Sequence, residues 1–308
     1  MYKKNHLLVA LFASLTFSAN ALAADTGIDL QANQAHIRTQ QNSEAISHLP
    51  KDLKLAVPGK FTVAIAALNS PPLALFADDN KTLIGSESDF AQLVADSLGL
   101  QLNIVPTSWE DWPLGVASGK YDAAITNVTV TKDRKAKFDF ATYRIDSLGF
   151  YVKSTNKITA INQASDIAGL KIIVSSGTNQ ESILLAWDKE NQQKGLPAIL
   201  PIYVTDDAAA NLALQSGRAD AYFGPNVMGA YKAKLTGKTK LVGKVDGGWP
   251  KVAHIAVTTK KGNGLVTPIN IALNGVIKGG EYDQVLNRWG ENVERIDRSE
   301  INPAGLGD

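Results

Sequence analysis

The chain has 308 residues, of which 44% are hydrophobic and 20% charged, and its formal net charge is +1. This length is enough for one large or two ordinary domains, and we expect two lobes. The near balance of charge argues against bulk electrostatic attraction to nucleic acid or anionic lipid. Because the sequence has no cysteine, disulfides, thiolate nucleophiles, iron–sulfur clusters and cysteine-based zinc sites are excluded.

Residues 1–23 have the three parts of a secretory signal peptide. Two lysines precede an apolar run from Leu7 to Phe17, and small residues follow up to Ala23. The run is shorter than the about 20 apolar residues that cross a bilayer. We therefore predict cleavage, release into a periplasm and no direct membrane insertion. The absence of cysteine at the cleavage point excludes a lipoprotein anchor, and the alternative interpretation is a short buried helix.

Residues 24–58 form a polar N-terminal arm by composition. Glutamine and asparagine are frequent there, and apolar residues show no sustained period. Such a segment has little apolar surface to bury, so we expect it to be loosely ordered.

Strand and helix patterns alternate from residue 59 onward. The predicted strands are residues 61–67, 100–105 and 121–125, and the predicted helices are residues 89–98 and 110–118. Glycines at 99 and 119 end the two helices. This alternation predicts an α/β domain with a largely parallel sheet.

A second α/β unit follows an extended connection. Its predicted strands are residues 148–152, 171–174, 202–204 and 220–223, and its predicted helices are residues 180–188, 206–215 and 226–234. The tail adds a strand at 254–257 and helices at 265–277 and 282–289. We expect residues 59–149 and 250–308 to form lobe 1 and residues 150–249 to form lobe 2.

The usual catalytic signatures are missing. The sequence has no glycine-rich phosphate loop with lysine, no G-x-S-x-G and no H-E-x-x-H. The four histidines lack the spacing of a metal site, so we expect neither a metal nor a cofactor. Paired carboxylates, such as those at 78–79 and 206–207, are interpreted as turn formers or helix caps.

The segment from Tyr121 to Phe140, YDAAITNVTVTKDRKAKFDF, holds the candidate binding chemistry. Its buried strand ends in a run of hydroxyl and amide side chains, Thr126, Asn127 and Thr129. Thr131 can cap a short helix that contains Arg134. Because guanidinium binds carboxylate bidentately, this arrangement favours a site for a small carboxylate. The alternative is that Arg134 belongs to a solvated basic face with its neighbouring lysines.

The succession of segments carries a family resemblance. In order they read SPPLALFADDNKTLIGSESDFAQLVADSLGL, SWEDWPLGVASGKYDAAITNVTVTKDRKAKFDFATYR, SDIAGLKIIVSSGTNQES, LALQSGRADAYF and INIALNGVIKGGEYDQVLNRWG. Over about residues 60–292 the chain resembles the bacterial extracellular solute-binding proteins, family 3, the amino-acid-binding components of ABC importers. The resemblance implies a two-lobed periplasmic binding protein fold (type II), with the ligand in the inter-lobe cleft and a monomeric state.

The resemblance also implies roles for individual residues. The arginine of the T-x-x-R segment, here Arg134, pairs with the ligand's α-carboxylate, helped by Thr126, Asn127 and Thr129. The G-T segment at the start of a lobe 2 helix donates N–H groups to the same carboxylate, here through Gly177, Thr178 and Asn179.

Two further side chains are assigned by the same resemblance, each with an alternative. Trp109 stacks on the ligand, or is a core or cleft-rim tryptophan. Glu87 contacts the ligand's side chain, or is a solvated charge beside Asp89.

The sequence departs from the family pattern at two places. Pro225 stands where an acid is expected to pair with the ligand's ammonium, and proline offers neither charge nor N–H. An ammonium without a carboxylate in a closed cleft is costly, so either Asn226 or Glu87 compensates or the amino group is substituted, quaternary or absent. Ser70 and Leu73 stand where aromatic residues often flank the proline segment.

We therefore expect a periplasmic binding protein, not an enzyme. It would capture a small carboxylate-bearing solute, an amino acid or a derivative, by hinge closure and deliver it to an ABC permease in the inner membrane. One alternative is a dehydratase of the cyclohexadienyl dehydratase type on the same fold, with Glu87 or Glu181 as the acid. Another is a sensory ligand-binding partner of a membrane protein.

Overall fold

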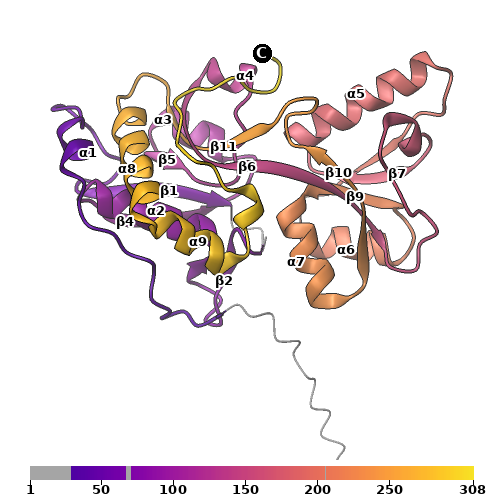
Figure 1. Ribbon diagram of the computed structural model, residues 1–308, viewed down its shortest axis with the longest axis horizontal. Coiled ribbons are helices and arrows are strands. Elements are labelled where there is room, and N and C mark those ends of the chain that lie inside the picture. The colour runs from indigo at the N-terminus through magenta and orange to yellow at the C-terminus, as the bar shows by residue number, and fades with distance from the viewer. Residues whose placement is uncertain (1–28, 67–70, 205) are drawn as a thin grey trace, which may run out of the picture.

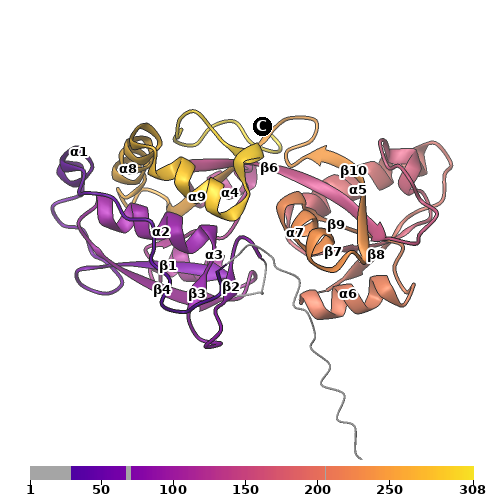
Figure 2. The same ribbon diagram turned by 60° about the horizontal axis from the view of Figure 1, so that its bottom comes forward.

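The computed structural model describes residues 29–66, 71–204 and 206–308 (Figure 1). The predicted signal peptide and the departure at Ser70 lie outside the described residues. The elements form two bodies at either end of the long strand β6 (Phe138–Lys153), which passes from one into the other in the two views of Figure 1 and Figure 2.

Lobe 1 is built on a sheet whose strands lie in the order β4 (Gln101–Thr107), β1 (Lys60–Ala66), β5 (Ala123–Ala124), β11 (Ala253–Lys260) and β6. Strand β1 pairs in parallel with β4 and β5, whereas β11 is antiparallel to β5 and β6. A small hairpin of β2 (Leu75–Phe76) and β3 (Leu83–Ile84) stands apart from this sheet.

Helices cover both faces of the lobe 1 sheet. Val63 and Ile65 pack into one apolar cluster and Ala64 into another, because successive strand residues point to opposite faces. The first cluster includes residues of α2 (Ser86–Ser97), α8 (Val266–Gly279) and α9 (Glu281–Trp289), and the second includes residues of α3 (Trp112–Ser118). The short helices α4 (Lys132–Lys135) and η2 (Asn292–Glu294) follow β5 and α9 in the chain.

Lobe 2 continues the sheet beyond β6. Its strands are β9 (Ala221–Pro225), β7 (Lys171–Val174), β8 (Leu200–Tyr203) and β10 (Thr239–Asp246), and its helices are η1 (Ala164–Ile167), α5 (Asn179–Gln193), α6 (Asp207–Gln215) and α7 (Asn226–Thr236). Strand β7 is parallel to β8 and β9, but β6 is antiparallel to β9 and β10. The predicted parallel arrangement therefore holds on each side of the sheet and fails in the middle.

The N-terminal arm is ordered over the residues described, which contradicts the expectation of a loose segment. Residues 43–47 form the helix α1 (Ser43–Ser47), capped by the Asn42 side chain, and Ala45 is fully buried. Ile37, Leu49 and Leu53 pack against the lobe 1 core. These apolar residues are too widely spaced to show a period, but they cover lobe 1 through long-range contacts.

Glycine at 85 fixes the start of α2, which carries Glu87. Gly85 has a φ of 127°, and a Cβ there would lie 2.2 Å from the Leu73 carbonyl oxygen. The amide N–H of Glu87 donates to that carbonyl oxygen at 3.1 Å. The close approach needs a residue without a side chain, and it sets Glu87 beside the ends of the lobe 1 strands.

Candidate functional site

A cleft cavity of about 100 Å³ is lined by residues from both lobes. Lobe 1 contributes Ala66 at the end of β1, Thr126 and Asn127 after β5, and Leu73, Ala74, Glu87, Trp109 and Glu110. Lobe 2 contributes Ser175 after β7, the first residues of α5, and Val204, Tyr222, Pro225 and Met228. Ligands in open α/β sheets bind at such carboxyl ends of strands.

Arg134 reaches from α4 toward lobe 2 and is not among the residues that line the cleft cavity, although the neighbouring Trp109 is. Thr131 caps α4 by accepting from the Arg134 N–H at 3.2 Å, as the sequence predicts. The guanidinium donates to the carbonyl oxygens of Thr129 at 2.8 Å and Gly177 at 3.1 Å, and it lies 5.4 Å from the Trp109 ring centre. Burial lowers the pKa of Arg134 to about 10, so the group is still protonated at neutral pH. It forms no ion pair with any described acid.

The start of α5 faces the cleft with its positive dipole end. Thr178 is its N-cap and accepts from the Glu181 N–H at 3.2 Å, and Thr178 and Asn179 both line the cavity. The Gly177 N–H already donates to the Glu181 carboxylate at 2.6 Å, and the Asn179 amide donates to the Gly247 carbonyl at 2.6 Å. The side chains of Thr178, Asn179 and Glu181 thus hold the start of α5 in place. An anion in the cleft would be attracted by the positive end of the helix dipole.

The polar run after β5 divides between the cavity and the interior. Thr126 and Asn127 line the cavity. Thr129 is fully buried away from the cavity lining, and its Oγ1 has no hydrogen-bond partner among the described residues. Asn127 has a φ of 52°, a left-handed conformation that asparagine tolerates better than most residues.

Glu87 is held in a buried network, so the alternative of a solvated charge is wrong. Its side chain is 1% exposed. One carboxylate oxygen accepts from the Asn127 N–H at 3.2 Å and lies 3.5 Å from Arg144, while the other accepts from the Tyr143 hydroxyl. Burial raises the pKa of Glu87, and the charge of Arg144 opposes that rise. Glu87 lines the cavity with both oxygens already occupied.

Of the remaining predicted residues, Trp109 and Pro225 line the cavity and Asn226 does not. Trp109 lines the cavity and packs edge-on against Trp112 with ring centres 6.0 Å apart. Pro225 lines the cavity and so presents no charge where the family pattern has an acid. Asn226 is outside the lining, because its side-chain oxygen accepts from the Tyr151 hydroxyl at 2.9 Å.

Comparison with known proteins places this site in a family. The sequence profile of the bacterial extracellular solute-binding proteins, family 3, matches residues 62–292. The chain belongs to this family. An L-cystine-binding protein of Escherichia coli (strain K12) is 31% identical over 221 residues, which are 71% of this chain and 78% of the relative. A putative ABC transporter arginine-binding protein of the same strain is 24% identical over 246 residues, 79% of this chain and 97% of the relative.

Solved structures of amino-acid-binding proteins share the fold. An ancestral arginine-binding protein bound to arginine matches with a TM-score of 0.66 at 28% identity, over 75% of this chain and 98% of that chain. An ancestral amino-acid-binding protein described as a precursor of cyclohexadienyl dehydratase matches with a TM-score of 0.64 at 26% identity, over 75% of this chain and 95% of that chain.

Sequence reasoning missed the groups that surround Glu87 in this solute-binding protein. Arg144 is fully buried and bonds to Glu294, Glu87 and the Asn127 side chain, with Glu291 at 3.5 Å. The signal in the sequence is weak, because β6 carries other polar residues, such as Asp139 and Asp146, besides this arginine. Tyr222 and Met228, which line the cavity, were also not singled out.

Two negative findings hold for the described part of the chain. No helix there is both long and apolar enough to span a bilayer. No group of three or more histidine or acidic side chains among the same residues is placed so that it could hold a metal ion.

Proposed function

We propose that the protein captures a small carboxylate-bearing solute, an amino acid or a derivative, and delivers it to an ABC permease in the inner membrane. In this proposal it works in a periplasm as a monomer, after removal of residues 1–23. The supporting observation is the Arg134 guanidinium, which forms no ion pair with a described acid and donates to the Thr129 carbonyl of lobe 1 and the Gly177 carbonyl that precedes α5. A carboxylate placed there gains a charge-assisted pair from Arg134 and the positive end of α5.

Hinge closure follows from the same contacts. Cavity-lining residues come from both lobes, so a solute that touches both stabilises the closed arrangement by its differential affinity. The lobes are joined by β6 and by the return between β10 and β11. Relatives whose names record cystine or arginine binding and an ABC transporter support the ligand class and the partner.

The test is ligand binding by the mature protein after it has been stripped of ligand and refolded. Amino acids, N-substituted derivatives and simple carboxylates are screened by thermal shift, because a ligand that binds only the folded state raises Tm. Arg134→Ala is expected to weaken the best ligand by about 2–5 kcal/mol, at least roughly thirtyfold in Kd. Arg218→Ala, at an exposed arginine of lobe 2, is the control and leaves the affinity unchanged. Unchanged affinity in the Arg134→Ala protein would show that Arg134 does not bind the ligand.

One observation supports the dehydratase alternative and another argues against it. A buried acid with a raised pKa, Glu87, lines the cleft, as a general acid would. Both of its oxygens, however, are occupied by Tyr143, Asn127 and Arg144. Glu181, the other candidate acid, accepts from the Gly177 N–H. Product release from prephenate or arogenate by the purified protein would overturn the binding-only proposal.

A further inference from the structure

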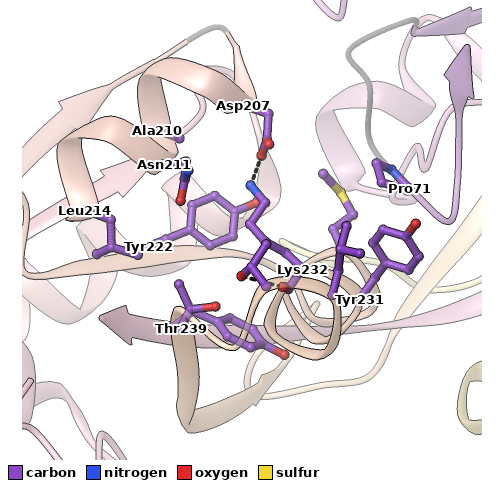
Figure 3. Close-up of a pocket in the computed structure, with 14 residues that line it drawn as sticks. Pro71, Asp207, Ala210, Asn211, Leu214, Tyr222, Tyr231, Lys232 and Thr239 are labelled. Atoms are coloured by element: carbon purple, nitrogen blue, oxygen red, sulfur yellow. Dashed lines mark hydrogen bonds and ion pairs between the residues drawn. The ribbon is translucent and has the colours of Figure 1, made fainter. Parts of the chain in front are cut away.

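A second cavity, of about 210 Å³, lies within lobe 2 between α6 and α7 (Figure 3). It is about twice the volume of the cleft cavity. An apolar cavity of about 150 Å³ already holds a benzene-sized molecule, so this space is large enough for an organic group.

The second cavity adjoins the cleft. Tyr222 and Met228 line both spaces, so they form a shared wall. Pro71 of lobe 1 also lines the second cavity, so the cavity extends to the boundary between the lobes. Figure 3 shows Pro71 across from the α6 and α7 side chains. A solute that reached from the cleft into the second cavity would therefore pass Tyr222 and Met228.

Glycines make room for the aromatic walls of this cavity. A Cβ at Gly229 would lie 2.1 Å from the Tyr151 ring, and a Cβ at Gly224 would lie 2.1 Å from the Tyr222 hydroxyl oxygen. Gly229 therefore lets the Tyr151 ring pack against α7, and Gly224 lets the Tyr222 side chain lie along β9. A larger residue at either glycine would force its tyrosine to move.

The lining is mostly apolar, with a few polar groups. Ala210, Leu214 and Leu235 form the apolar part, and an ion pair between Asp207 and Lys232 joins α6 to α7. Figure 3 shows this pair beside the Tyr222 ring. Burial and the charge of Asp207 raise the pKa of Tyr222, so its hydroxyl keeps its proton at neutral pH.

One buried hydroxyl in the cavity lacks a partner. Thr239 is 8% exposed, and its Oγ1 makes no hydrogen bond to any described residue. This oxygen has less than 1 Å² of accessible surface, so it is not open to a ligand in the cavity. The cavity is thus suited to a mainly apolar chain.

We propose that this cavity holds an apolar extension of the bound solute. In this proposal the carboxylate head sits at Arg134, and a flexible chain of a few heavy atoms passes Tyr222 and Met228 into lobe 2. The proposal rests on the proposed function and narrows the ligand class to amino acids with an elongated, largely apolar group on the side chain or on the nitrogen. Pro225 is compatible with an uncharged nitrogen, because it brings no acid to the cleft.

The experiment compares three probes by calorimetry: L-alanine, L-methionine and N-hexanoylglycine. Each buried methylene tightens binding about fourfold. We expect at least one extended probe to bind on the order of tenfold more tightly than L-alanine. A gain with L-methionine alone assigns the extension to the side chain, and a gain with N-hexanoylglycine alone assigns it to the nitrogen.

Matched variants locate the effect in the cavity. Asn211 lines it, whereas the neighbouring Leu212 is 60% exposed. Asn211→Phe should abolish the advantage of the extended probe and keep L-alanine binding, and Leu212→Phe should keep both. Ala210→Leu, which also fills the cavity, replaces Asn211→Phe if circular dichroism shows that variant unfolded.

Either of two results excludes the second cavity as a ligand site: equal affinities for the three probes, or an advantage of the extended probe that survives in a folded cavity-filled variant. In both cases the proposed function still stands if L-alanine binds and its binding depends on Arg134. Failure of all three probes to bind counts against both.

Discussion

Arg144 is the least expected residue of the structure, because it is a fully buried cation that faces several carboxyl groups. Glu87, Glu291 and Glu294 lie within 3.5 Å of its nitrogens, and all are at most 1% exposed. Removing one partner of a buried ion pair leaves charge without compensation in a poorly solvated place. Arg144 therefore holds Glu87 and the Asn127 side chain in place at the cleft.

Arg144→Met tests this role. We expect the free energy of unfolding, measured by urea denaturation at pH 7, to fall by about 3–5 kcal/mol. The loss should be smaller at pH 5, because carboxyl groups deprived of the arginine can take up protons. Arg295→Met is the control: Arg295 pairs with Asp283 and Asp297 at the surface, and we expect a cost below about 1 kcal/mol. Equal losses in the two variants would contradict the role given to Arg144.

At the scale of elements, the N-terminal arm is part of lobe 1. Helix α1 contacts α2 and α8, and Ala45 is fully buried in the lobe 1 core. The arm also contributes Arg38, which pairs with Asp96 of α2. The arm runs directly into β1, so lobe 1 is assembled from two separate stretches of chain, one that includes the arm and one that begins with β11.

Ala45→Asn measures what the arm contributes. A buried amide without partners should lower the free energy of unfolding by roughly 2 kcal/mol, while ligand affinity is unchanged. Glu44→Asn, at an exposed position of the same helix, should have little effect. Equal stability of the two variants in urea would show that the arm adds nothing to lobe 1.

Local patterns predicted the elements that local interactions determine. Helices α2, α5, α6 and α8 follow their apolar spacing and caps, and the Thr131 cap that sets Arg134 lies three residues away in sequence. Strand β10 was missed because its register shifts between Leu241 and Gly243, which interrupts the two-residue alternation. The Arg144 network was missed because its parts are distant in sequence: Arg144 and Glu294 are 150 residues apart.

At the scale of the whole molecule, a buried acid, Asp146, lies where the two lobes join. Asp146 lies on β6 beside the return at Gly247 and is 2% exposed. Burial, with the nearby Glu294, raises the pKa of Asp146 to about 7 against an opposing effect of Arg144. Burial likewise raises the pKa of Glu291 to about 7. The folded protein therefore binds protons on these acids more tightly than the unfolded chain does.

This difference predicts the sign of the pH dependence. The stability that comes from protonated Asp146 is fully present below the unfolded pKa of about 4 and is lost as pH rises through about 7. Between pH 4 and pH 8 its contribution to the free energy of unfolding should fall by roughly 2–4 kcal/mol. Asp146→Asn has no such proton to lose, so its stability should decline less than that of the natural protein over this range.

Asp283→Asn, at a partly exposed acid, is the matched control and should follow the natural protein. Urea denaturation at several pH values decides the matter: parallel curves for Asp146→Asn and the natural protein would mean that Asp146 is ionised in the folded state throughout. A flatter curve would show that the junction between the lobes is held together by a protonated acid, whose loss of its proton places a negative charge beside the carboxylates that surround Arg144.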